Sequence, residues 1–107
     1  MTSQPPDLSA ASERTRQRLL TRYLQDLVTE VAGLAEPPPR DVGLFDLGVE
    51  SLHAVEIKGT LELAFGIELD DTLLIEEPTI AAIVRVLDER TRPDAGLPGP
   101  VGTFSEP

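Results

Sequence analysis

A chain of 107 residues has room for one domain of ordinary size. Hydrophobic residues make up 40% of it, enough for a core, and the absence of cysteine excludes disulfides, thiolate metal sites and cysteine catalysis. Nineteen acidic against nine basic side chains give a net charge of −10, which argues against a nucleic-acid partner and favours basic protein surfaces. A single histidine, His53, leaves no imidazole cluster for a metal.

The sequence contains no segment typical of a signal peptide or a membrane span, because no apolar run approaches the required length. We therefore expect a cytoplasmic protein with no membrane partner. Residues 1–12 are polar and residues 92–107 are rich in proline and glycine, so both are expected to be flexible tails. The sequence thus predicts one domain over residues 13–91.

The first predicted helix runs from about Glu13 to Ala32, with Ser12 as its N-cap and Gly33 as its stop. Its apolar residues keep the i, i+3, i+4 spacing of one buried face: Leu20, Tyr23, Leu24, Leu27, Val28 and Val31. This pattern predicts an amphipathic helix that packs one side against a core.

A long connection follows over residues 34–48, and its three consecutive prolines (Pro37, Pro38 and Pro39) favour an extended path. So long a loop is uncommon in a compact domain. We expect three apolar residues to anchor it to the core: Leu44, Phe45 and Leu47.

The second helix is predicted to begin at Ser51 and to end near Phe65, with Gly66 as its stop. A short helical or turn element is expected over Asp71–Ile75. The last helix follows the N-cap Thr79, and its buried stripe is Ile80, Ile83, Val84 and Leu87. No segment of the sequence is long enough and regular enough in its alternation of apolar and polar residues to predict a β-strand. The prediction is an all-α bundle of three main helices plus one short helix, with a long loop between the first and second helices.

The second helix has apolar residues on two faces. One face suits a core, with Ala54, Ile57, Leu61, Ala64 and Phe65, and the other carries Leu52, Val55, Gly59 and Leu63. The second stripe is either covered by the long loop or exposed for docking. Charge favours docking, because residues 41–90 hold twelve acidic and only three basic side chains.

The sequence LFDLGVESL, residues 44–52, opens this helix and strongly resembles the 4′-phosphopantetheine attachment site of the acyl carrier protein family. In that family a Leu-Gly pair, any residue and an acidic residue precede Ser-Leu. The resemblance covers about residues 17–91. The later step Glu77-Pro78-Thr79-Ile80 is more like polyketide synthase carriers than fatty-acid carriers. Glu50 stands where aspartate is commoner and keeps the negative charge.

The chemistry of Ser51 agrees with this resemblance. A serine that follows a glycine and opens a helix is exposed, and a phosphodiester on its Oγ lies at the positive end of the helix dipole. The resemblance implies 4′-phosphopantetheine on Ser51, carrying acyl groups as thioesters. The prosthetic group would then supply the thiol that this cysteine-free chain lacks.

The resemblance implies a non-catalytic carrier that presents acyl intermediates to enzymes of polyketide-type biosynthesis. Met1 and the short tails suggest a discrete protein rather than a domain excised from a larger synthase, and we expect a monomer. The implied partners are a phosphopantetheinyl transferase, an acyltransferase or acyl-activating ligase, and a ketosynthase. The expected docking surface consists of acidic and apolar residues on and beside the second helix: Asp46, Glu50, Leu52, Val55, Glu56, Gly59, Glu62 and Glu76.

Other functions remain open from the sequence. An aminoacyl or peptidyl carrier of a hybrid pathway would share the motif, and a non-carrier acidic helical interaction module would share the fold. A serine hydrolase is disfavoured, because Ser51 and His53 project about 200° apart on one helix. His53 is expected to be an exposed helix residue. The acidic pairs Asp70-Asp71 and Glu76-Glu77 lack the spacing of a calcium loop, so no metal is expected.

Overall fold

The computed structural model describes residues 5–8 and 12–91. Its elements, in chain order, are α1 (Glu13–Ala32), the 3₁₀ helix η1 (Leu44–Leu47), α2 (Ser51–Phe65), α3 (Leu73–Glu76) and α4 (Ile80–Thr91). The prediction of an all-α bundle with three main helices and one short helix is confirmed. Most of the two expected tails lies outside the described residues.

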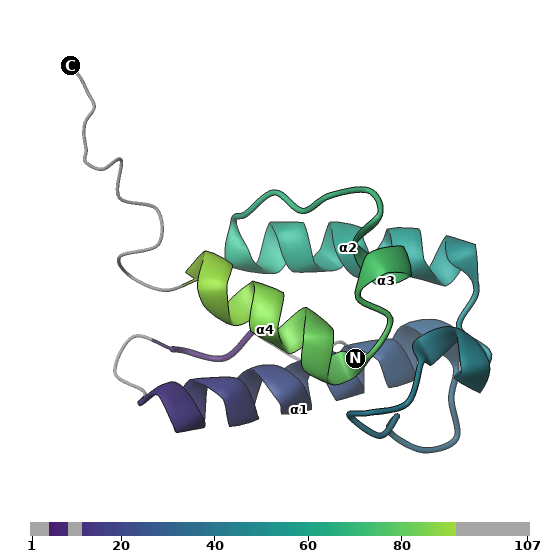
Figure 1. The fold of residues 1–107 in the computed structure, drawn as a ribbon, viewed down its shortest axis with the longest axis horizontal. Helices are drawn as coiled ribbons and strands as arrows, with labels where there is room; N and C mark the ends of the chain where they lie inside the picture. The colour runs from purple at the N-terminus through teal and green to yellow at the C-terminus, as the bar shows by residue number, and fades with distance from the viewer. Residues whose placement is uncertain (1–4, 9–11, 92–107) are drawn as a thin grey trace.

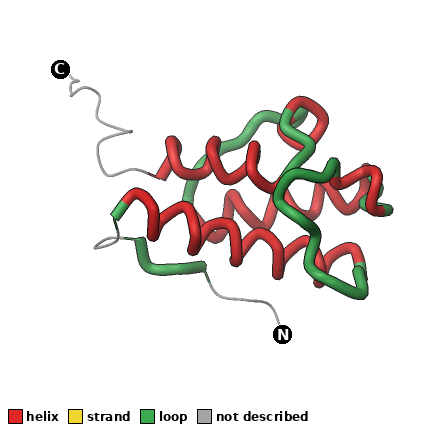
Figure 2. Tube along the Cα trace, turned by 60° about the horizontal axis from the view of Figure 1, so that its bottom comes forward, coloured by secondary structure: helices red, strands yellow, loops and turns green. Residues whose placement is uncertain are grey.

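The three main helices pack as a bundle with α1 and α2 running in opposite directions (Figure 1). In that view α4 crosses between them, and α3 lies beside α2. The start of α2 therefore lies at the same end of the bundle as the finish of α1. Figure 2 shows the described chain as helices joined by loops, without strands. Within these residues, no helix combines the length and the apolar character needed to cross a membrane.

The helix boundaries follow from local capping. The Ser12 hydroxyl accepts a hydrogen bond from the Thr15 N–H at the start of α1, and Thr79 Oγ1 accepts one from the Ala82 N–H at the start of α4. Gly33 ends α1 in the left-handed conformation that glycine adopts without strain. These three predicted boundaries are confirmed.

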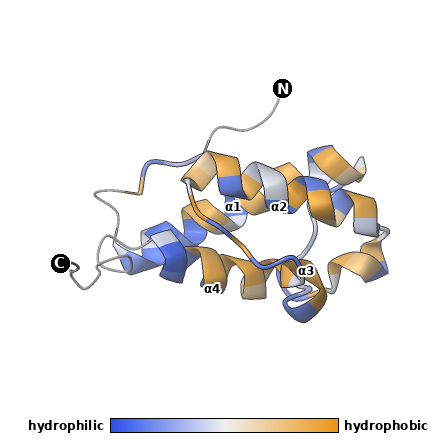
Figure 3. Ribbon diagram, turned by 90° about the horizontal axis from the view of Figure 1, so that it is seen from above, coloured by the Kyte–Doolittle hydropathy of each residue, from blue (hydrophilic) through white to orange (hydrophobic). Residues whose placement is uncertain are grey.

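The core is formed by the predicted apolar faces. From α1, the fully buried or nearly buried residues are Leu20, Tyr23, Leu24, Leu27 and Val28, with Val31 packed at the edge. From α4 they are Ile80, Ile83, Val84 and Leu87. Figure 3 shows α4 changing from hydrophobic in its first turns to hydrophilic in its last turns. Its polar end nevertheless has a buried carboxylate, Asp88, which the sequence pattern did not reveal.

The long loop is held against the beginning of α4. The Leu44 N–H donates to Pro78 O at 2.8 Å, and the Ala81 N–H donates to Arg40 O at 3.0 Å. Leu44 is fully buried and Leu47 packs against the core, as predicted. The prediction that Phe45 anchors the loop was wrong, since its side chain is 39% exposed. Successive residues of a 3₁₀ helix project about 120° apart, so burying Leu44 turns Phe45 outward.

The short element after α2 lies slightly later than expected, over Leu73–Glu76 rather than Asp71–Ile75. Leu73 and Leu74 are buried and Leu69 fills the core ahead of them. Burial of these leucines sets the position of the helical turn, and this depends on packing that periodicity alone does not show.

Candidate functional site

The turn before Ser51 buries Val49 in the core and leaves the residues on either side of it exposed. Gly48 ends η1 with φ at 99°, and its N–H donates to Phe45 O at 3.3 Å. Val49 is then buried, and its N–H donates to Leu44 O at 3.2 Å. Glu50 and Ser51 come out of this anchored turn and are exposed. The turn thus places the serine hydroxyl at the protein surface.

Ser51 is the first residue of α2, and the N-cap is Glu50. The Glu50 N–H donates to Nδ1 of His53 at 3.0 Å. His53 is therefore half-buried and supplies part of the helix cap, which corrects the prediction of an exposed residue. Its Nδ1 is engaged with the backbone, and among the described residues the Ser51 hydroxyl has no hydrogen-bond partner. The hydroxyl is thus left available for chemistry.

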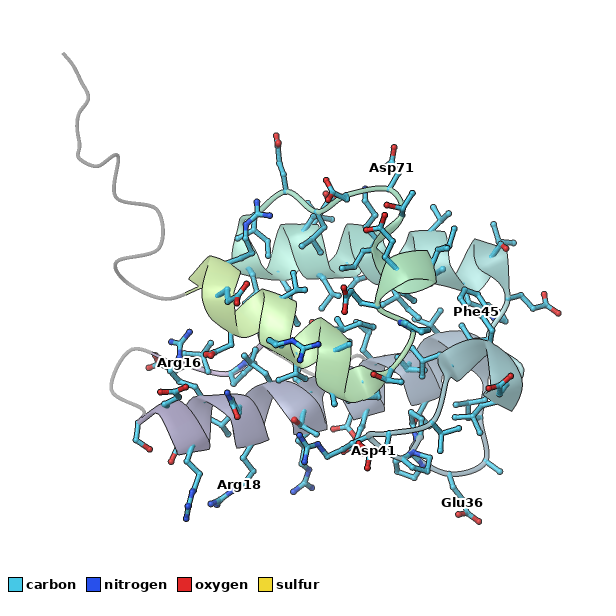
Figure 4. The ribbon with its side chains drawn as sticks, viewed as in Figure 1. Arg16, Arg18, Glu36, Asp41, Phe45 and Asp71 are labelled. Atoms are coloured by element: carbon cyan, nitrogen blue, oxygen red, sulfur yellow. The ribbon has the colours of Figure 1, made fainter. Side chains whose placement is uncertain are left out.

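An apolar groove of about 220 Å³ lies beside Ser51. It runs between η1, α2 and α3, and Figure 4 shows Phe45 at the right of the molecule and Asp71 at its upper edge. The residues that line it are Phe45, Ser51, Ala54, Val55, Lys58, Asp71, Leu74 and Ile75. Phe45, which was expected in the core, therefore lines the groove beside Ser51.

A charged cluster closes one side of this groove. Lys58 Nζ lies 3.2 Å from Asp71 Oδ1 and 3.4 Å from Glu62 Oε2. The hydrogen bond to Asp71 is the main cause that raises the pKa of Lys58. The Leu69 N–H, which donates to Glu62 Oε2 at 2.8 Å, is the main cause that lowers the pKa of Glu62. These contacts tie α2 to the loop that leads into α3.

The second apolar stripe of α2 is not covered by the long loop. Leu52, Val55 and Leu63 are 76%, 67% and 88% exposed. Ile75 on α3, which the sequence analysis did not single out, is 71% exposed and lines the same groove as Val55. A β-carbon added to Gly59 would meet no atom within 4 Å, so the helix surface is open there.

Most of the predicted acidic docking residues share this exposure. They are Asp46, Glu50, Glu56 and Glu76. Glu62 differs, because its carboxylate is turned toward Lys58 and the Leu69 backbone. No sequence signal pointed to this role, since the Leu69 partner lies in an irregular loop.

The family model for the phosphopantetheine attachment site matches residues 22–87. The chain belongs to this family, that of the acyl carrier proteins. Among solved structures it is similar to BlmI, a type-II acyl carrier protein from Streptomyces verticillus involved in bleomycin biosynthesis. The TM-score is 0.65 with 29% identity, over 70% of this chain and 89% of BlmI.

Two curated relatives illustrate the range of similar proteins. The chain is 37% identical over 93 residues to the spectinabilin polyketide synthase system protein NorA′ of Streptomyces orinoci, covering 85% of this chain and 3% of that protein. It is 36% identical over 84 residues to a dimodular nonribosomal peptide synthase of Bacillus subtilis, covering 78% of this chain and 4% of that protein. The chain therefore spans only a few per cent of the length of these relatives.

Members of this family carry a covalently attached 4′-phosphopantetheine, and the residues around Ser51 fit such a group. The hydroxyl is exposed, the first N–H groups of α2 lack carbonyl partners within their own helix, and the helix dipole favours a phosphate there. The apolar groove adjoining the serine can receive the less polar part of the arm. When bound, the group supplies a terminal thiol that holds an acyl group as a thioester.

Proposed function

We propose that Ser51 is the attachment residue for 4′-phosphopantetheine and that the chain presents acyl thioesters to enzymes of polyketide biosynthesis. The observation that carries the assignment is a free serine hydroxyl at the first position of α2, exposed by an anchored turn. The similarity to NorA′, a polyketide synthase system protein, supports the pathway class.

In this proposal the chain performs no catalytic step. Ser51 holds the prosthetic group, Glu50 and His53 fix the beginning of α2, and the groove beside Ser51 shelters part of the arm. The partners are those expected from the resemblance: a phosphopantetheinyl transferase, an acyltransferase or acyl-activating ligase, and a ketosynthase. A monomeric state and a cytoplasmic location belong to the same proposal.

The docking surface in this proposal is the first part of the exposed stripe of α2, next to Ser51, with its acidic border. Leu52 and Val55 provide apolar area next to Ser51, while Glu56 provides charge. Acidic groups around an apolar centre favour fast and reversible encounters with basic enzyme surfaces. Ile75 extends the apolar area from α3.

A second cargo class is supported by the similarity to a nonribosomal peptide synthase. An aminoacyl or peptidyl carrier would use the same serine and the same arm. Acyl-loading assays with malonyl-coenzyme A and an acyltransferase, set against aminoacyl loading by an adenylating enzyme, distinguish the two cargoes.

Attachment at Ser51 is tested by the intact mass of the purified protein after incubation with coenzyme A and a broad-specificity phosphopantetheinyl transferase. We expect a gain of one phosphopantetheine in the wild type and none in Ser51→Ala. Ser12→Ala is the matched control, because Ser12 also stands at a helix start but is engaged in its cap. A gain that persists in Ser51→Ala, or no gain in folded wild type with two transferases, would overturn the assignment.

A further inference from the structure

The surface away from Ser51 contains a hollow of about 270 Å³ on the first half of α1. It is lined by polar side chains of α1 and of the long loop: Arg14, Gln17, Arg18, Thr21 and Arg40. In Figure 4, Arg18 points away from the bundle below α1, whereas Phe45 and Asp71 lie toward the other side. The hollow is therefore separate from the groove beside Ser51.

The three arginines in the hollow are exposed and lack carboxylate partners among the described residues. Two other arginines of the chain are used differently. Arg16 is buried against Asp88, and Arg85 lies 3.7 Å from Glu77. Three unpaired guanidinium groups gathered around one concave surface are unexpected in a protein with a net charge of −10.

The side chains that line the hollow suit carboxylate partners. Guanidinium groups bind carboxylates with two parallel hydrogen bonds, and this geometry makes arginine better suited than lysine to such partners. Arg14 and Arg18 are one helical turn apart, so their Cα atoms are about 6 Å apart along the axis. This spacing matches alternate residues of an extended strand or residues i and i+4 of a helix.

Charge distribution limits the size of the partner. Residues 41–90 hold twelve acidic side chains against three basic ones, and this excess repels an extended anionic surface such as a membrane or a nucleic acid. Salt screens charges beyond about 8–10 Å, so a short acidic segment seated in the hollow interacts mainly with the local arginines.

We propose that the hollow formed by Arg14, Arg18 and Arg40 docks a short acidic segment of a partner protein. The molecule then has two docking surfaces of opposite charge, one acidic and apolar beside Ser51, the other basic on α1. The second surface can hold a partner while the first presents cargo, and its binding does not depend on the prosthetic group.

The test is a titration of ¹⁵N-labelled protein with an oligoglutamate peptide of about ten residues, followed by NMR. We expect shifts confined to α1 and to the loop around Arg40. The double variant Arg14→Gln/Arg18→Gln is expected to weaken binding about tenfold, the loss typical of two exposed charge pairs. Arg85→Gln/Arg90→Gln is the matched control, because it makes the same change in net charge outside the hollow.

Four results would overturn the proposal. Binding weakened equally in both double variants would indicate general electrostatic attraction. Inorganic phosphate that binds as tightly as the peptide and shifts the same residues would indicate a small-anion site. Concentration-dependent shifts of these residues without peptide would indicate that a second copy of the chain fills the hollow. Absence of peptide binding at low salt would exclude the docking site.

Discussion

Gly48 is held in a left-handed backbone conformation two residues before the N-cap of α2. Because an added β-carbon would meet no atom within 4 Å, the requirement for glycine comes from φ alone. We expect Gly48→Ala to lower the free energy of unfolding by about 1–2 kcal/mol, as measured by urea denaturation.

Gly59 gives a matched control for this prediction. It also has open space around its Cα, but it lies inside α2, where alanine is favoured by roughly 1 kcal/mol. Gly59→Ala should therefore stabilise the protein. If both substitutions stabilise the protein, the turn before Ser51 does not require glycine at position 48.

Protonation of the Glu62 carboxylate couples the stability of the fold to pH. The hydrogen bond from the Leu69 N–H lowers the pKa of Glu62 below its ordinary value of 4.5. The ionised carboxylate therefore contributes its full stabilisation of the fold above pH 4.5, and this stabilisation is lost as the pH falls through the lower pKa of Glu62 in the folded protein. We expect Glu62→Gln to lower the urea midpoint at pH 7 and to lose this difference at acidic pH.

The control is Glu56→Gln, which removes an exposed carboxylate from the same helix. This variant makes the same change in net charge without removing the bond to Leu69. An equal loss of stability at pH 7 in both variants would attribute the effect to net charge rather than to the contact of Glu62 with the Leu69 backbone.

At the scale of elements, α2 presents one face to the core and another to solvent. Ile57 and Leu61 are fully buried, while Leu52 and Leu63 lie exposed near opposite ends of the helix. These two exposed leucines are separated by about 16 Å along the axis. They therefore distinguish docking beside Ser51 from a general effect of surface hydrophobicity.

We expect Leu52→Ala to lower the rate of acyl transfer by a partner enzyme about tenfold at subsaturating carrier, because buried leucine area contributes directly to docking. Leu63→Ala should leave the rate within about twofold, since Leu63 lies far from the first turn of α2. The measurement is the transfer rate for each variant in its phosphopantetheinylated form. Equal effects of the two substitutions would contradict a docking centre beside Ser51.

Across the whole molecule, a buried ion pair joins the first helix, α1, to the last helix, α4. Arg16 Nε donates to Asp88 Oδ1 at 3.0 Å, and its Nη2 donates to Asp88 O at 3.1 Å and to Thr91 Oγ1 at 2.9 Å. Figure 4 shows Arg16 at the end of the bundle away from Phe45. This cluster holds α4 against α1, and none of its three residues lines the groove beside Ser51.

Asp88→Asn should destabilise the fold by about 3 kcal/mol, because it removes the negative charge that balances the buried Arg16 guanidinium. Glu89→Gln, which changes an exposed neighbour, should have little effect. Urea denaturation measures both, and phosphopantetheinylation at a temperature where the variants remain folded should proceed as in the wild type. Equal stability of the two variants would show that the pair contributes little.

Local sequence signals were sufficient to predict the main helices and the exposed serine. Ser12, Thr79, Gly33 and the 3.6-residue periodicity of the apolar residues predicted the main helices, since capping and amphipathicity act within a few residues. The attachment-site motif lies within nine consecutive residues, 44–52, and predicted the exposed serine. The assignment of the prosthetic group to Ser51 stays a prediction until its mass is measured.

Tertiary structure decided the features that depend on distant partners. Arg16 and Asp88 are 72 positions apart, so no local pattern indicates that they meet. The outward turn of Phe45 and the inward turn of Glu62 depend on how backbone groups are oriented once loops are packed. The cap supplied by His53 is local, three residues from Glu50, but its sequence signal was missed. The sequence by itself determined the helices and the serine, because those follow from neighbouring residues. The groove and the charges around it depend on the tertiary packing of η1, α2 and α3 against one another.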